Sequence, residues 1–487
     1  MLAVVVLAVC VDAALRRRTS KAWRDARGAG GAAEGAALFA EEEGLGRGAG
    51  DAPAASSAAG RSRAHSRNAF SPRSYLGRLG KLLGDDEISH RRVGLAVATS
   101  AAGLAAARAA SRKFEHVPYA DEMTAAGNRV SYYRSANNQR VADALRSLEA
   151  YATPTFYNKH LMTGAPILRI DDDDLLFQRH VLSARLDGHL VEVAADTLAS
   201  PRASLDSPSF IVVPGFGGSS EKNLYRILAK SIAERFNAHV HILHERGEGG
   251  VPLRSHKLHK MDTRMLEALI EKVRADRGMQ VPLFGLGLSQ GGSLLLKYIQ
   301  GFAAPGSPPC PFAAVMTVGC TFQYQVGLQL MEVNGLVGRC YSYILAKMHI
   351  DILRRNKEVL DNLDNVDIGE IATCSNLSDL DRKLANPVYG HHSVVAYHDS
   401  FNLVEQAHNI NIPVLCLHSE DDPLFSDDTH RIQRAAARCS DRIVFFSVPR
   451  GGHLSFCERG TRSTYVTRVA DRFFKTLLQQ QRPVDGQ

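Results

Sequence analysis

The stretch VPLFGLGLSQGG at residues 281–292 decides which fold this chain can adopt. Its first eight residues are mostly apolar, which is typical of a buried strand, and a helical pattern of apolar residues follows it. At the junction stands a Gly-X-Ser-X-Gly motif centred on Ser289. Glycines two places before and after the serine permit a tight turn into which no larger residue fits. The stretch therefore predicts a nucleophile elbow that presents Ser289 above a sheet.

A nucleophilic serine needs a base, and a carboxylate that holds this base in the right tautomer. In folds with a nucleophile elbow, the acid follows the serine along the chain and the histidine follows the acid. Asp422 stands in an acidic turn after a predicted strand at 413–417, and Pro423 fixes this turn. Asp422 is therefore the predicted acid, with Asp421 and Glu420 as alternatives.

The predicted base is His453, one of nineteen histidines in the chain. It follows the last predicted strand, 443–448, and comes directly after Gly451 and Gly452. Two glycines allow the loop to carry a histidine back over the strand ends. This position, rather than the residue type, favours His453 as the partner of the serine.

Acyl transfer also requires backbone donors for the oxyanion. The amide of Gln290, directly after the serine, is the first predicted donor. The second is expected from the glycine-rich loop PGFGG at 214–218, where the backbone can approach a substrate closely. We assign it to Phe216, with Gly217 as the alternative.

The rest of the domain alternates buried strands with amphipathic helices. This pattern is typical of a mostly parallel sheet with helices on both faces, and together with the elbow it predicts an α/β-hydrolase fold. The helices are expected over 224–236, 265–273, from about 291, and 465–478. The expected strands are Phe210–Val213, His239–Leu243, the run into Ser289, Phe312–Val318, Val414–Leu417 and Ile443–Val448.

One interval interrupts the alternation. Residues from about 321 to 412 are helical in pattern and far too many for a simple crossover between two strands. They predict a helical cap over Ser289. The apolar residues of this cap either line a channel for an acyl chain or only pack the cap onto the sheet. They are Val326, Leu328, Leu330, Met331, Leu336, Tyr343, Ile344 and Leu345.

Composition narrows the classes of partner. The net charge of +7 is spread over 58 basic and 51 acidic residues, with no basic patch interleaved with aromatic residues, so nucleic-acid binding is not expected. The eight cysteines lack Cys-X-X-Cys and zinc spacings and are expected to be reduced, with a Cys310–Cys340 disulfide as an alternative. Asp171–Asp174 lacks the glycine of a calcium loop and is expected at a solvated strand edge. We expect no metal and no cofactor, and the oligomeric state is open.

The N-terminal part predicts attachment to a membrane surface. Residues 1–18 are a candidate anchor, because a short apolar run is followed by three arginines, and a mitochondrial transit segment is the alternative. Residues 19–90 are expected to be a disordered low-complexity tail. Residues 91–150 are expected to be a helical lead-in, with a helix at 141–151 and a candidate membrane-associated segment at 93–110, before an α/β-hydrolase domain at 151–480. The endoplasmic reticulum is the expected location, with mitochondrial or cytoplasmic location as alternatives.

Seven motifs occur in the order found in the YheT-like α/β hydrolases. This branch includes the abhydrolase-domain lipases of types one and three and the fungal medium-chain ester synthases, and the resemblance covers roughly residues 150–480. The motifs are YATPTFYNKHLMT at 151–163, PGFGGSS at 214–220, HERGEGGVPL at 244–253, GLSQGG at 287–292, NPVYGHHSVVAYH at 386–398, EDDP at 420–423 and RGGHLSF at 450–456.

The resemblance implies a carboxylic ester hydrolase that acts on lipid esters such as acylglycerols or phospholipids. It places the nucleophile at Ser289, the acid at Asp422 and the base at His453. Three positions depart from the branch, namely Pro214 in place of His, Gln290 in place of Leu or Met, and His244 in place of Asn, and these concern substrate preference. The alternatives are an acyltransferase that passes the acyl group to an alcohol, a non-catalytic lipid-binding protein, and a serine peptidase. All three keep the fold.

Overall fold

The computed structural model describes residues 119–481, apart from 165–174, 257, 259–260, 305, 334, 362, 364–365, 405, 426 and 461–462. The predicted anchor at 1–18, the tail at 19–90, the segment 93–110 and the acidic run at 171–174 lie outside the described residues. Within the described part, no helix combines the length and the apolar character that a bilayer crossing requires.

Ten strands form one sheet in the order β1-β2-β10-β9-β8-β7-β5-β6-β4-β3. The six strands in its middle run parallel, and their residues are almost all buried because helices cover both faces. The predicted mostly parallel sheet is thus confirmed. These strands are β5 (Ser209–Val213), β6 (His239–Leu243), β7 (Leu283–Leu288), β8 (Ala314–Val318), β9 (Val414–Ser419) and β10 (Ile443–Val448).

Antiparallel pairs extend the sheet at both edges. On one side, β3 (Gln178–Leu186) pairs with β4 (His189–Ala199), which joins β6. On the other side, β1 (Tyr119–Met123) pairs with β2 (Arg129–Tyr133), which joins β10.

The hairpin of β1 and β2 corrects the prediction of a helical lead-in over 91–150. The prediction is wrong for residues 119–133, because this segment belongs to the main sheet. Gly127, at φ +76°, makes the turn of the hairpin, and Val130 is fully buried. The helix expected at 141–151 is α5 (Ala136–Arg146), which begins earlier because the Ser135 hydroxyl caps it by accepting from the Asn138 amide at 3.2 Å.

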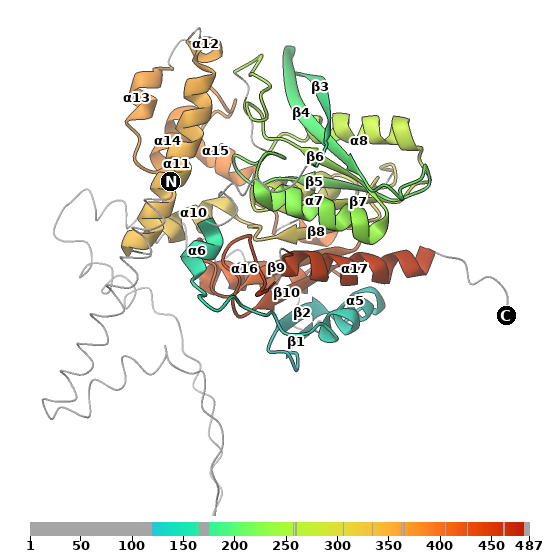
Figure 1. Ribbon diagram of the computed structural model, residues 1–487. Helices are drawn as coiled ribbons and strands as arrows, with labels where there is room; N and C mark the ends of the chain where they lie inside the picture. The colour runs from blue at the N-terminus through green and yellow to red at the C-terminus, as the bar shows by residue number, and fades with distance from the viewer. Residues whose placement is uncertain are drawn as a thin grey trace, which may run out of the picture. The chain divides into compact units, whose positions relative to one another are not determined.

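Helices pack on the two faces of the sheet around two separate cores. On one face α7 (Asn223–Phe236) and α17 (Tyr465–Gln481) lie side by side (Figure 1), and Phe474 contacts Phe210 and Phe284 with ring centroids 5.2 and 5.0 Å away. The other face holds α8 (Arg264–Arg277), α9 (Gln290–Gln300) and α16 (Asp427–Arg438). Two smaller helical segments also occur, α6 (Lys159–Gly164) and η2 (Ala407–Asn409).

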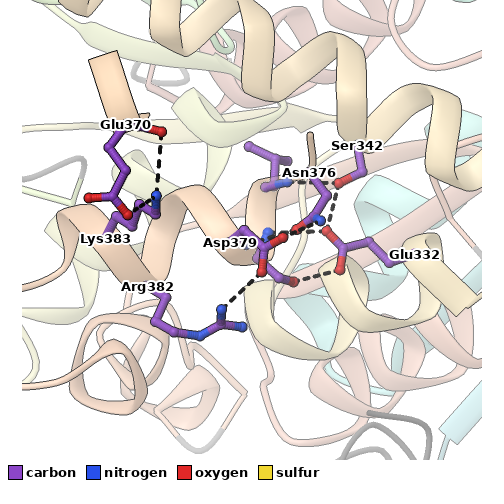
Figure 2. Close-up of polar contacts among 9 residues, drawn as sticks. Glu332, Ser342, Glu370, Asn376, Asp379, Arg382 and Lys383 are labelled. Carbon is purple, nitrogen blue, oxygen red and sulfur yellow. Dashed lines mark hydrogen bonds and ion pairs between the residues drawn. The ribbon is translucent and has the colours of Figure 1, made fainter. Parts of the chain in front are cut away.

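The insertion between β8 and β9 is helical. A carboxylate ties three of its helices together: Glu332 of α10 accepts from the Ser342 hydroxyl of α11 at 2.6 Å and from the Ser378 hydroxyl of α14 at 2.6 Å. Figure 2 shows this cluster beside the ion pair of Arg382 with Asp379, at 2.9 Å. The cap comprises α10 (Tyr324–Val333), α11 (Gly335–Arg355), α12 (Lys357–Leu360), α13 (Ile368–Ala372), α14 (Leu377–Leu384) and α15 (Val394–Asp399).

Candidate active site

Ser289 stands at a strained turn between β7 and α9. Its backbone has φ +51° and ψ −121°, a conformation that non-glycine residues rarely adopt. The flanking glycines are required by space, since a Cβ on Gly287 would lie 2.5 Å from the Gly292 Cα and one on Gly291 would lie 2.2 Å from the Val213 carbonyl oxygen. This arrangement matches the elbow that the sequence predicts.

The structure brings Ser289, His453 and Asp422 together in one hydrogen-bonded chain. The Ser289 hydroxyl lies 2.9 Å from His453 Nε2, and His453 Nδ1 lies 2.6 Å from Asp422 Oδ2. The second oxygen of Asp422 accepts from the Leu424 amide at 2.9 Å, which holds the carboxylate in place. The side chains of Asp422 and His453 are almost fully buried, so water competes little for these bonds. In this geometry the serine can donate its proton to the imidazole.

The two alternative acids have other partners. The Asp421 carboxylate accepts from the amides of Gly451, at 3.0 Å, and Gly452, at 3.2 Å. Glu420 accepts from the Ser447 hydroxyl. Asp421 therefore fixes the turn that carries His453, and only Asp422 contacts its ring.

Sequence reasoning missed the role of Tyr157. Its hydroxyl donates to Asp421 and accepts from the Gly451 amide at 2.7 Å. Burial raises the pKa of Tyr157 well above its usual value, and the Asp421 carboxylate raises it further, so the hydroxyl keeps its proton. Tyr157 lies within the first of the seven motifs, but nothing in its neighbours along the chain indicates a contact so distant in sequence.

The predicted oxyanion donors, Phe216 and Gln290, both line the cavity onto which Ser289 opens. The alternative donor does not suit the role, because the Gly217 amide already donates to the Glu245 carboxylate. The Gly215 amide likewise donates to the Tyr225 hydroxyl at 3.0 Å. The amides of Gly215 and Gly217 therefore help to hold the loop in place at the wall of the cavity that contains Ser289.

A second buried cluster braces this loop from behind and was also missed. Asp196 on β4 accepts from Arg179 at 2.7 and 2.8 Å, and His244 Nε2 lies 3.0 Å from it. The Ser220 hydroxyl, at the end of the oxyanion loop, donates to the same carboxylate. Burial by itself raises the pKa of Asp196, but the hydrogen bonds from Arg179, His244 and Ser220 outweigh burial and lower this pKa below its usual value.

The cavity in front of Ser289 has a volume of about 220 Å³, and residues of the cap form part of its lining. Leu336 and Tyr343, two residues expected as candidates for its lining, are instead 56% and 41% exposed. The side chains of Val326 and Leu330, two further candidates, lie outside the described part of the structure. Four of the expected residues do line it, namely Leu328, Met331, Ile344 and Leu345. An apolar lining of this kind suits a hydrocarbon chain.

The seven cysteines in the described part of the chain are free, so the alternative Cys310–Cys340 disulfide is not formed. Over the same residues, no group of three His, Cys, Asp or Glu side chains is placed to hold a metal ion.

The sheet order, the elbow at Ser289, and the acid and histidine that follow β9 and β10 define an α/β hydrolase. A family model described as "Serine aminopeptidase, S33" matches residues 207–459, and the chain belongs to this hydrolase family. The resemblance to the abhydrolase-domain branch is confirmed as well, since the similar proteins carry that name.

Two relatives and one solved structure illustrate these similarities. The chain is 25% identical to phospholipase ABHD3 of Bos taurus over 276 residues, which are 56% of this chain and 64% of the relative. It is 24% identical to monoacylglycerol lipase ABHD2 of Danio rerio over 263 residues, 52% of this chain and 60% of the relative. The chain thus spans less than two thirds of these relatives. The esterase Pf2001 of Pyrococcus furiosus is 9% identical, with a TM-score of 0.39 and coverage of 68% of this chain and 97% of the other.

Proposed function

We propose that the protein is a serine hydrolase that cleaves carboxylic esters of lipids. The hydrogen-bonded chain from Ser289 through His453 to Asp422, opening on an apolar cavity, carries this proposal. The family match supports a hydrolase in general, and the printed names of the relatives, a phospholipase and a monoacylglycerol lipase, support lipid esters in particular.

The reaction begins with attack of the Ser289 oxygen on the ester carbonyl, while His453 Nε2 takes the hydroxyl proton. Asp422 holds the imidazole in the tautomer that accepts it and stabilises the imidazolium. The amides of Phe216 and Gln290 bind the oxyanion of the tetrahedral intermediate. His453 then gives its proton to the departing alcohol. A water molecule, deprotonated by His453, hydrolyses the acyl-enzyme, and the fatty acid leaves with Ser289 restored.

The cavity favours a lipid ester over a peptide. An aminopeptidase has to hold the positively charged amino terminus of its substrate, and a carboxylate serves this purpose best. Among the described residues that line the cavity, there is no Asp or Glu. The lining from the cap is instead mostly Leu, Ile, Met and aromatic side chains, which stabilise an acyl chain by removing it from water.

The test is hydrolysis of a panel of acylglycerols and phospholipids of varied chain length by the full chain and by Ser289→Ala. Release of fatty acid by the wild type alone supports the proposal. Absence of hydrolysis across the panel contradicts it and favours the non-catalytic alternative. The same incubations with an added alcohol separate hydrolysis from acyl transfer, because an acyltransferase forms a new ester instead of the free acid.

We also propose that the N-terminal sequence holds the protein at a membrane surface. Lipid esters reside in membranes, the apolar run at the start of residues 1–18 is followed by three arginines, and the apolar segment 93–110 also has basic flanks. The endoplasmic reticulum is the proposed location. Fractionation of cells that express the chain with and without residues 1–118 tests this proposal, and equal membrane recovery of the two forms contradicts it.

A further inference from the structure

One cation stands in the wall of the otherwise apolar cavity. Lys222 lines it together with Ser289, Phe216 and Tyr225, so the lysine belongs to the side of the cavity that the oxyanion loop forms. Apart from His453, Lys222 is the one titratable nitrogen base in the lining that the structure describes. A residue of the wall shared with Ser289 therefore carries a positive charge.

No carboxylate of the described residues neutralises this charge. Within the part of the chain that the structure describes, the Lys222 side chain forms no ion pair or hydrogen bond, and no Asp or Glu lines the cavity. Its neighbour Glu221 is half exposed and lies 4.0 Å from Arg179. Glu245, at the end of β6, accepts from the Gly217 amide. Both of these acids thus have other partners.

The position of Lys222 in the helix adds to the positive potential. It is the N-cap residue of α7, a helix of 14 residues, and its side chain does not cap the helix. The first amides of a helix carry a partial positive charge and favour an anion. Lys222 and the end of α7 therefore both favour negative charge at one side of the cavity.

We propose that Lys222 binds a phosphate group on the alcohol side of the substrate ester, so that the enzyme favours glycerophospholipids over uncharged acylglycerols. This inference rests on the proposed function. The acyl chain occupies the apolar lining contributed by the cap, and the phosphate pairs with the ammonium group in a charge-assisted contact. A half-buried cation with no competing carboxylate gains more from such a contact than a lysine on the open surface.

The experiment compares two substrates with the same acyl chains, dioctanoyl phosphatidylglycerol and dioctanoylglycerol, in micelles of one uncharged detergent. The quantity of interest is the ratio of kcat/KM for the phospholipid to kcat/KM for the neutral lipid. Lys222→Gln should lower this ratio about tenfold, and Lys222→Arg should restore most of it. Lys230→Gln removes the same charge from α7 two turns further on, outside the cavity lining, and should leave the ratio unchanged.

An unchanged ratio in Lys222→Gln, or an equal fall in Lys230→Gln, overturns the role of Lys222 while Ser289-dependent hydrolysis continues. If the wild type hydrolyses neither substrate and Ser289→Ala behaves identically, the proposed function itself fails, and the inference fails with it. High salt should reduce the ratio in the wild type more than in Lys222→Gln, since screening weakens a contact between charges.

Discussion

Asp421 and Asp422 are consecutive residues whose carboxylates hold two different parts of the same histidine loop. Asp422 Oδ2 lies 2.6 Å from His453 Nδ1, whereas Asp421 Oδ1 accepts from the Gly451 amide at 3.0 Å and the Gly452 amide at 3.2 Å. One carboxylate orients the imidazole ring, and the other fixes the backbone that carries it. The two acids should therefore differ in what their loss changes.

Replacing Asp422 with asparagine should lower kcat by about 10³- to 10⁴-fold, because an amide in this place favours the wrong tautomer of His453. Asp421→Asn is the matched variant and should lower kcat by about tenfold at most, through a less well fixed loop. Steady-state hydrolysis of a lipid ester measures both. A larger loss in Asp421→Asn than in Asp422→Asn would show that the acid has been misassigned.

Replacing Tyr157 with phenylalanine removes a hydroxyl that donates to Asp421 and accepts from Gly451. Asp421 Oδ2 then loses its hydroxyl donor, and the Gly451 amide keeps only Asp421 Oδ1 as an acceptor, so the free energy of unfolding should fall by about 1–3 kcal/mol. Urea denaturation followed by circular dichroism measures this change. The control Tyr343→Phe removes a hydroxyl from a side chain that is 41% exposed, and it should change the free energy of unfolding little. Equal stability of the two variants would contradict the bracing role of Tyr157.

Replacing Gly291 with alanine tests the elbow itself. The new Cβ would lie 2.2 Å from the Val213 carbonyl oxygen, so the strand and the helix have to separate, and we expect a loss of more than about 3 kcal/mol or failure to fold. Gly327→Ala makes the same change in α10, where the nearest atom is the Thr321 hydroxyl at an ordinary 3.5 Å. Soluble yield and thermal melting compare the two variants, and a normal melting temperature for Gly291→Ala would refute the packing described here.

Stability should fall in acid because of His418. This side chain is fully buried on β9, neither ring nitrogen has a hydrogen-bond partner, and its ring stacks on Phe445 at 4.7 Å. Burial, followed by the nearby His430 and His453, holds the pKa of His418 well below 6.5. The unfolded chain therefore binds a proton below about pH 6.5 that the folded chain excludes, so stability is unaffected above this pH and is lost as pH falls.

The size of this effect is about 1 kcal/mol per pH unit for one such histidine. His418→Phe should flatten the pH dependence of the free energy of unfolding between about pH 6.5 and pH 5 by that amount. His189→Phe, at an exposed position, serves as the control and should leave the slope as in the wild type. An unaltered slope in His418→Phe would mean that His418 is protonated in the folded state.

The sequence predicts the central strands of the sheet from their buried apolar runs. It predicts Ser289, Asp422 and His453 because each of these residues follows a strand, in a turn marked by glycine, proline or acidic residues. These signals are local. The contact of Tyr157 with Asp421 joins residues 264 positions apart. The contact of Asp196 with His244 joins β4 to the residue directly after β6, and these meet only in the folded sheet. No periodicity along the chain encodes either contact.

The edge strands escaped prediction for a different reason. The hairpin of β1 and β2 has strands of five residues each, in which the charged residues Asp121, Glu122 and Arg129 interrupt the apolar pattern. The edge strand β1 tolerates charge on its exposed face, and both strands are short, so their pattern is hard to separate from that of a loop. Gly127 in the turn is the one local signal that could have located the hairpin.

The most direct measurement is reaction of the full chain with a fluorophosphonate, followed by mass spectrometry to locate the modified residue. The proposed chemistry requires that the serine beside His453 is a nucleophile, so the wild type should be modified at Ser289, and Ser289→Ala should not react. Absence of modification in the folded wild type, or equal modification of Ser289→Ala, would contradict the assignment of a serine hydrolase.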